Sequence, residues 1–131
     1  MNAASADNAR IGNAHRLVHL CTREEWDRAQ VEGARRTPSL DSDGFVHLSA
    51  PRQVHLPANR LFAGRDDVVL LWLDPDRLGA PVKWEPGVPT DPESMRFPHL
   101  YGPLPASAVV SVTDYRPGPE GTYAALPGTT E

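Results

Sequence analysis

The sequence predicts a single α+β domain, in which a compact, bent sheet of mixed or antiparallel strands packs with two small helices. Its apolar residues fall in short runs separated by turn-forming residues, and the elements do not alternate as a βαβ repeat would. The 14 prolines and 10 glycines favour short elements joined by many turns. We expect the domain to span residues 15–125, between a disordered lead-in at 1–14 and a disordered tail at 126–131.

The first strand and the first helix follow one another directly. Residues 16–21 alternate in polarity as a strand does, so that His19 shares a face with Leu17 and Cys21. Thr22 and Glu25 form a capping box that begins a helix at about residues 23–32, and Gly33 ends it. The apolar stripe of this helix carries Trp26 and Ala29.

The second strand follows a polar loop, which we expect at residues 34–42. An Asp43-Gly44 turn begins this strand at residues 44–49, and alternation puts its side chains on two faces. Val46 and Leu48 suit the core; the opposite face carries Phe45, His47 and Ser49. Ser49 is expected as an N-cap, with Pro51 in the first turn of the helical segment that follows.

The second half of the chain supplies one further helix and the remaining strands. The helix resumes at Pro57, with Ala58, Leu61 and Phe62 directed inward, and it closes at Gly64. The continuous apolar run at 68–73 indicates a central strand covered on both faces. The remaining predictions are a helical turn at 74–79, a strand at 82–85, a mobile loop at 86–96, a rigid segment at 97–103, a closing strand at 108–115 and an edge strand at 122–124.

Charge and composition exclude several classes of protein. A net charge of −4 argues against a general nucleic-acid or anionic-membrane binder, although the basic residues Arg35, Arg36, Arg52, Arg60 and Arg65 could hold a phosphate locally or simply be solvated. No run is long enough to span a membrane, and residues 1–15 lack the apolar core of a signal peptide. The single cysteine excludes an intramolecular disulfide. We therefore expect a cytoplasmic protein that binds a small molecule, of undetermined oligomeric state.

Three histidines and one glutamate are the candidate chemical groups. His19 and His47 lie mid-strand among aliphatic residues, His99 follows the stiff Pro98, and Glu85 ends a strand. Each alone is as well explained as a satisfied core histidine or a solvated carboxylate, the latter paired with Lys83. Together they predict a shared pocket in which His47, Glu85 and His99 are catalytic.

The neighbouring residues predict how a ligand is held. Phe45, Trp84 and Tyr101 could form a stacking wall for a planar ring, although each could equally be plain core. Ser49 and Arg52 lie where a strand runs into a helix, which is a common place for an anion to bind. Three imidazoles would suffice for a zinc ion, but no two of them have a local ligand spacing, so no metal is predicted.

Four segments of the chain together resemble one protein family. These are His19-Leu20, the run from Asp43 to Ser49, Lys83-Trp84-Glu85 and the run from Phe97 to Tyr101. They resemble the family catalogued as domain of unknown function 952, over about residues 16–115. That family is similar in turn to the ADP-ribosyltransferase superfamily.

The resemblance implies an ADP-ribosyltransferase-like fold, a split and strongly bent sheet whose cleft accepts NAD as a substrate. It implies that His19 holds the ribose and phosphates, that His47 and Ser49 shape the nicotinamide side, and that Glu85 holds the ribose 2′-hydroxyl. Three hypotheses stay open: an enzyme using NAD or another phosphorylated nucleoside, a metal-free acid–base enzyme acting on a small metabolite, and a binding module without catalysis.

Overall fold

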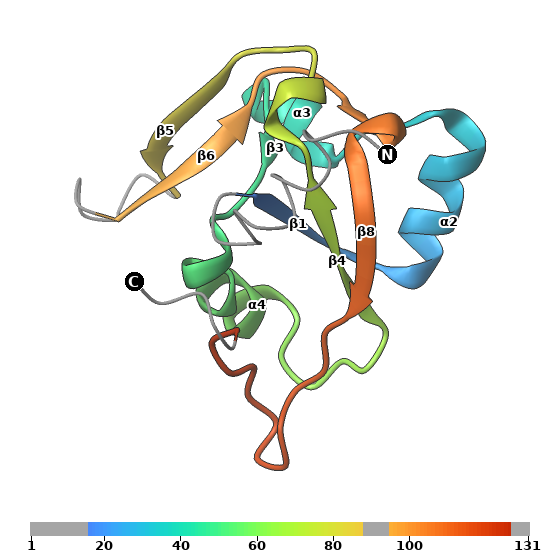
Figure 1. The fold of residues 1–131 in the computed structure, drawn as a ribbon. Coiled ribbons are helices and arrows are strands. Elements are labelled where there is room, and N and C mark those ends of the chain that lie inside the picture. Colours follow the sequence, from blue (N-terminus) through green and yellow to red (C-terminus); the bar gives the residue numbers. More distant parts are fainter. Residues whose placement is uncertain (1–15, 88–94, 127–131) are drawn as a thin grey trace, which may run out of the picture.

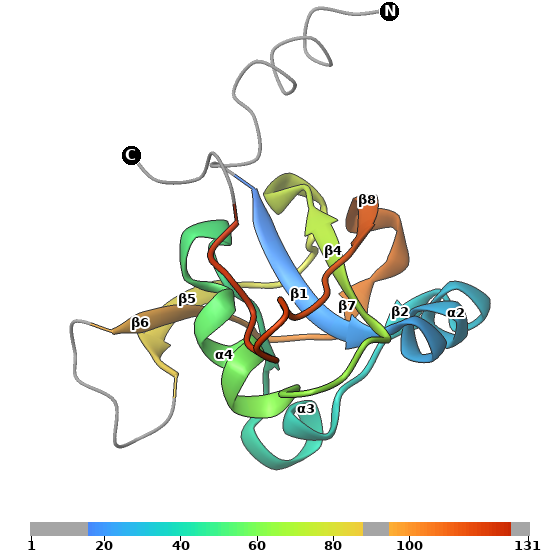
Figure 2. The ribbon, with the colours of Figure 1, turned by 90° about the horizontal axis from the view of Figure 1, so that it is seen from below.

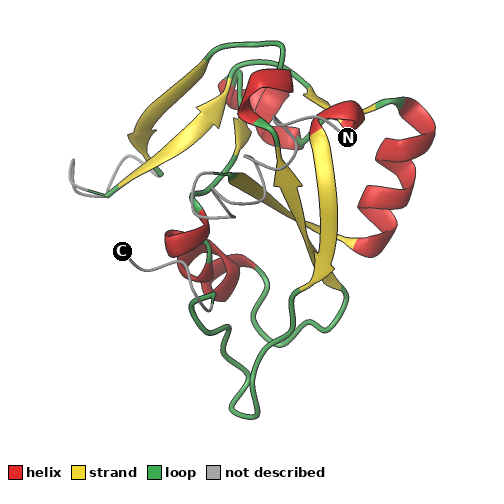
Figure 3. Cartoon of the chain, in the orientation of Figure 1, coloured by secondary structure: helices red, strands yellow, loops and turns green. Residues whose placement is uncertain are grey.

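The computed structural model describes residues 16–87 and 95–126, which form an α+β domain with several antiparallel sheets (Figures 1 and 3). The sheet with the longest strands has the order β1-β4-β8, with β1 at Leu17–Thr22, β4 at Val68–Leu73 and β8 at Val109–Asp114. All six residues of β4 are buried, as the continuous apolar run predicts for a central strand.

The two faces of β1-β4-β8 carry two separate apolar clusters. One contains Cys21 and Leu71 and is covered by Trp26 and Ala29 of α2 (Arg23–Glu32). The other contains Val18, and it is covered by residues from α4 (His55–Leu61) and the chain just after the 3-10 turn η2 (Pro51–Gln53). The two helices therefore lie on opposite faces of the sheet, as Figure 1 shows.

A second sheet has the order β3-β6-β5 and carries most of the predicted site. β3 is Val46–His47, β6 is Arg96–Leu100 and β5 is Val82–Pro86. A third, two-stranded sheet pairs β2 (Ala34–Arg35) with β7 (Leu104–Pro105). Figure 2 shows β5 and β6 projecting on the side of the molecule away from α2. Two further 3-10 turns are η3 (Pro75–Arg77) and η4 (Ala106–Ala108).

The chain after β3 crosses from this sheet to the first. The Leu48 N–H still donates to the Pro98 carbonyl of β6. One residue later, Ser49 exchanges two backbone hydrogen bonds with Val18 of β1. This crossing ties the two three-stranded sheets together directly behind His47.

The first helix forms as the sequence predicts, over Arg23–Glu32. Both hydrogen bonds of the Thr22–Glu25 capping box are present, at 2.8 and 3.1 Å. Gly33 ends the helix in the left-handed conformation, with a φ of 86° that a side chain would disfavour.

The expectation of two helices and a polar loop at residues 34–42 is wrong, because the described residues contain a third helix. This is α3 (Pro38–Asp43), which begins with a proline in its first turn and ends at Gly44 in the left-handed conformation. Its six residues are too few to show an apolar stripe, so its sequence has the character of a loop. The same stretch contains the short strand β2.

Three smaller predictions are also wrong. Leu61 is 65% exposed, because α4 ends there and only its earlier residues meet the core. Residues 122–124 form no strand; Tyr123 is held there by side-chain hydrogen bonds with Asn59. Ser49 is not an N-cap, since the residue before the 3-10 turn is Ala50.

The rigid segment predicted at residues 97–103 contains most of a strand, β6, which lies centrally in its sheet in spite of Pro98. Strands β4, β5 and β8 and the helical turn after β4 lie where the sequence predicts them. The predicted lead-in at 1–14 and most of the tail and of the loop at 86–96 fall outside the described residues. No helix among the described residues is long and apolar enough to cross a membrane.

Candidate functional site

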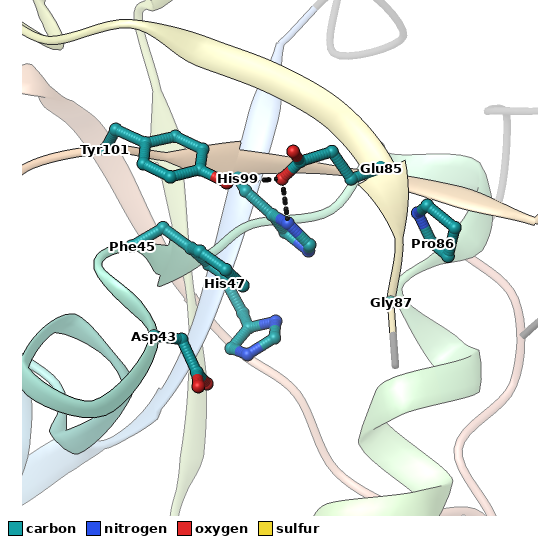
Figure 4. A pocket seen from close by; sticks show the side chains of 8 residues that line it. All are labelled: Asp43, Phe45, His47, Glu85, Pro86, Gly87, His99 and Tyr101. Atoms are coloured by element: carbon teal, nitrogen blue, oxygen red, sulfur yellow. Dashed lines mark hydrogen bonds and ion pairs between the residues drawn. The ribbon is translucent and has the colours of Figure 1, made fainter. Parts of the chain in front are cut away.

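A pocket of about 460 Å³ opens on the β3-β6-β5 sheet (Figure 4). Five of the residues predicted for the site line it: Phe45, His47, Glu85, His99 and Tyr101. They come from separate segments of the sequence and lie in, or directly adjoin, the three strands of this sheet. The volume lies in the range of about 300–1,000 Å³ that is usual for small-molecule sites.

Glu85 accepts two hydrogen bonds on the same oxygen. Its Oε1 lies 2.7 Å from the Tyr101 hydroxyl and 2.8 Å from Nδ1 of His99. The hydrogen bonds from Tyr101 and from His99 lower the pKa of the Glu85 carboxyl, so that it is ionised at neutral pH. The same hydrogen bond to Glu85 raises the pKa of Tyr101. Among the described residues, none forms a hydrogen bond with Oε2 of Glu85, so this oxygen is available to a ligand.

An aromatic stack fixes the position of His99. The Phe45 ring lies parallel to the His99 ring, with centroids 3.9 Å apart and an interplanar angle of 7°. His99 is only 2% exposed, and its Nε2 has no hydrogen-bond partner among the described residues. An ionised carboxylate can accept hydrogen bonds but cannot donate them, so Nδ1 of His99 carries the proton of its bond to Glu85. In the neutral ring, Nε2 of His99 is then an acceptor.

His47 lies at the more open side of the pocket. Its ring meets the His99 ring edge-on at a centroid distance of 5.0 Å and meets Phe45 at 4.9 Å. The side chain is exposed, yet these neighbours remove part of its hydration, and this lowers the pKa of His47; the nearby His99 lowers it further. A neutral imidazole at a pocket mouth can accept a proton at neutral pH.

His19 supports this site from behind. It is buried, with its Nδ1 2.8 Å from the backbone oxygen of His47 and its Nε2 accepting a hydrogen bond of 2.8 Å from Nε of Arg35. Burial lowers the pKa of His19 to about 3, and the Arg35 charge adds to this effect. His19 is therefore a neutral imidazole with both nitrogens engaged, which holds the backbone of β3.

Comparison with known proteins gives a family but no activity. The family model described as "Protein of unknown function (DUF952)" matches residues 20–112. The chain belongs to this family. It resembles the crystal structure of protein CC0527 from Caulobacter crescentus, with 34% identity and a TM-score of 0.70, over 83% of this chain and 93% of that chain.

Two further structures of CC0527 agree with that result. A double mutant gives 33% identity and a TM-score of 0.70, with the same coverage. The solution NMR structure gives 34% identity and a TM-score of 0.68, over 82% of this chain and 90% of that chain. No protein with a curated function matches the chain.

In this DUF952 member, four of the nine predicted site residues do not line the pocket. His19 and Ser49 are buried behind it. Arg52 is exposed in η2. Trp84, 42% exposed, projects from the opposite face of β5 to Glu85, because successive side chains of a strand alternate. Their roles as ligand contacts stay predictions.

The pocket of this DUF952 member also contains residues that the sequence pattern does not single out as site residues. Asp43, Pro86 and Gly87 line it. In the sequence, Asp43-Gly44 and Pro86-Gly87 are turn signals, but turns adjoining the strands of a site are also the places from which loop residues reach it. Among the described residues, no three His, Cys, Asp or Glu side chains are arranged to hold a metal ion. That the site works without a metal stays a prediction.

Proposed function

We propose that the chain is an enzyme that acts on NAD or a related nucleotide and transfers its ribosyl group, in the manner of an ADP-ribosyltransferase. The observation that supports this most is the convergence of His47, Glu85 and His99 from three strands on one pocket with an aromatic wall. The family resemblance supports the choice of substrate, for which it implies a cleft in a split, bent sheet.

Glu85 is the group that stabilises the reacting sugar in this proposal. Breaking the bond between the ribosyl carbon and the nicotinamide nitrogen leaves both electrons on nitrogen and a positive charge on the sugar. An ionised carboxylate offsets that charge, and it also accepts a hydrogen bond from a ribose hydroxyl. Tyr101 and His99 keep Glu85 ionised and leave its Oε2 for this purpose.

His47 takes the proton that the acceptor loses. When water or an acceptor hydroxyl adds to the sugar carbon, one proton must leave the attacking oxygen. A neutral imidazole at the open side of the pocket accepts it, and the lowered pKa keeps His47 neutral at pH 7. His19 acts as a positioning residue in this scheme, since its hydrogen bond fixes the backbone from which His47 projects.

The test is incubation of the protein with NAD, with released nicotinamide measured by chromatography. We expect release by the wild type and at least a hundredfold slower release by Glu85→Gln, which keeps the shape of the side chain and removes its charge. Glu120→Gln is the matched control, because Glu120 is exposed at a turn and does not line the pocket. If the wild type binds no NAD, or binds it and releases no nicotinamide, the proposal is contradicted.

A second candidate is a metal-free acid–base enzyme that acts on a small metabolite other than NAD. The lowered pKa of His47 beside an ionised carboxylate favours it, because proton abstraction requires nothing more. This candidate would be selected if the protein turns over such a metabolite equally well with and without NAD. The turnover should be lost in His47→Gln and in Glu85→Gln. A ligand that binds and returns unchanged after long incubation would instead select a binding module.

A further inference from the structure

We propose that this pocket binds a planar organic cation, such as an amidinium or a pyridinium, and excludes anions of the same shape. The inference rests on the proposed function in that it concerns the same pocket, and it names the charge of the group that enters. It makes no use of catalysis, so it can be tested separately.

The charges of the pocket wall favour a cation. Two carboxylates, Asp43 and Glu85, line it, and no lysine or arginine is among the described lining residues. The hydrogen bonds to Glu85 keep it ionised, and His47 does not balance the charge, because its own pKa is lowered. Figure 4 shows Asp43 beside His47 and Glu85 beside His99, so the two carboxylates lie at opposite ends of the imidazole pair.

The hydrogen-bonding character of the wall points the same way. The free oxygen of Glu85 accepts hydrogen bonds, and so does the carboxylate of Asp43. The Tyr101 hydroxyl is a donor, but Glu85 already receives its hydrogen bond. The buried Nε2 of His99 has no partner among the described residues, and in the neutral ring it is a further acceptor. A wall rich in acceptors selects a ligand that brings N–H donors.

One aromatic ring that lines the pocket already contacts a cation of the chain itself, outside the pocket. The ammonium of Lys83 lies 4.8 Å from the centroid of the Tyr101 ring. This is the geometry of a cation–π contact, in which the negative face of the ring attracts a positive charge. Lys83 is exposed and does not line the pocket, so a ligand cation would be repelled by it at a distance but need not displace it.

The same charges indicate where a phosphate cannot lie. Arg60 and Lys83 act on the site electrostatically, Arg60 on His47 and Lys83 on Glu85, but neither lines the pocket. Phosphates of a nucleotide would be repelled by the two carboxylates and would therefore lie outside the pocket. The ring at the other end of the ligand would enter, and a positive ring would be preferred.

The test compares three probes of one shape: benzamidine, which is a cation, benzamide, which is neutral, and benzoate, which is an anion. Each is titrated into the full chain by calorimetry at low ionic strength. We expect benzamidine to bind at least tenfold more tightly than benzamide, and benzoate more weakly than either, since roughly tenfold per charge is what a partly solvated pair at close range supplies. Added salt should reduce the difference.

Three variants locate the effect. Glu85→Gln and Asp43→Asn should each weaken benzamidine severalfold and leave benzamide unchanged, whereas Lys83→Gln should strengthen benzamidine. Asp43 is exposed at the end of α3, so its variant is expected to fold even if the Glu85 variant does not. Glu120→Gln should change nothing.

Three results would overturn the inference: benzoate binding as tightly as benzamidine, no difference between benzamidine and benzamide, or no binding of any probe. The outcome is distinct from that of the proposed function. A cation preference without nicotinamide release would leave this inference standing and remove the proposed function, and nicotinamide release without a charge preference would do the reverse.

Discussion

His19 makes the stability of the domain depend on pH in a way that can be calculated. Burial and the Arg35 charge lower the pKa of His19 from 6.5 to about 3 in the folded protein. In the unfolded chain its pKa is the ordinary value, so between these two values the unfolded state binds the additional proton. The His19 contribution to stability is therefore constant above about pH 6.5 and falls as the pH decreases toward 3.

The magnitude follows from how far the pH lies below the pKa of His19 in the unfolded chain. A pH of 5 lies about 1.5 units below the ordinary histidine pKa of 6.5, and each unit corresponds to about 1.36 kcal/mol. The His19 contribution to the free energy of unfolding should therefore be about 2 kcal/mol smaller at pH 5 than at pH 7.5. His47 acts in the same direction, because its pKa is lowered too.

The assay is urea unfolding of the wild type and of His19→Gln at pH 7.5 and pH 5, followed by tryptophan fluorescence. Trp26 and Trp72 are buried, so unfolding changes their environment. Glutamine keeps a donor and an acceptor but does not titrate, and the contribution of His47 cancels because both proteins contain it. The wild type should lose about 2 kcal/mol more than the variant on acidification.

Two results would refute this reasoning. One is an equal pH dependence of the wild type and His19→Gln. The other is an imidazole of His19 that titrates near pH 6.5 in an NMR experiment on the folded protein, because a histidine hydrogen bonded at both nitrogens in the interior cannot take a second proton at that pH without losing the bond from Arg35.

Three further predictions concern the fold. Cys21 should not react with a disulfide reagent at pH 8 until the protein is unfolded, since burial raises the pKa of its thiol to about 12; fast stoichiometric labelling of the folded protein would contradict this. Thr22→Ala should lower the free energy of unfolding by about 1 kcal/mol by removing the N-cap of α2, as measured by urea unfolding, and an unchanged midpoint would show that the cap is dispensable. Gly102→Ala should cost about 1–3 kcal/mol, because its Cβ would lie 2.8 Å from that of Ala80, and Ala80→Gly in the same chain should remove most of that cost in a double-mutant cycle.

Elements with a strong local signal could be predicted from the sequence. The capping box at Thr22 and the glycine at residue 33 set the limits of α2 within the chain alone. The continuous apolar run of β4 could only be accommodated in the centre of a sheet. The helix α3 could not be recognised in the same way, because six residues without a buried member contain no periodic pattern.

Alternation along one strand predicted part of the site and failed where the strand changed partner. Phe45 and His47 do share the pocket side, as the pattern from Asp43 onward predicts. Ser49 is two residues further on, but by then the chain has left β6 and pairs with Val18 of the other sheet. A face defined within one sheet does not continue into another, and no local pattern announces the crossing.

The position of Trp84 is decided by the same alternation that places Glu85. Neighbouring residues of β5 point to opposite faces, so a wall that contains Glu85 cannot contain Trp84. The alternation of the two faces can be recognised in the sequence. The prediction that Trp84 and Glu85 both contact one ligand is inconsistent with that alternation. The hydrogen bond from Arg35 to His19, in contrast, joins residues 16 positions apart on different sheets, and only the tertiary structure could show it.

The register of β5 on β6 links the stability of the sheet to the chemistry of the site. Lys83 lies opposite His99, and Glu85 lies opposite Phe97 further along the same pair of strands. A slip of one residue would turn Trp84 toward the pocket face and place Glu85 on the other face. The hydrogen bonds from His99 and Tyr101 to Glu85 can form only in the observed register. The contacts that keep the carboxylate ionised therefore also favour the observed pairing of the two strands.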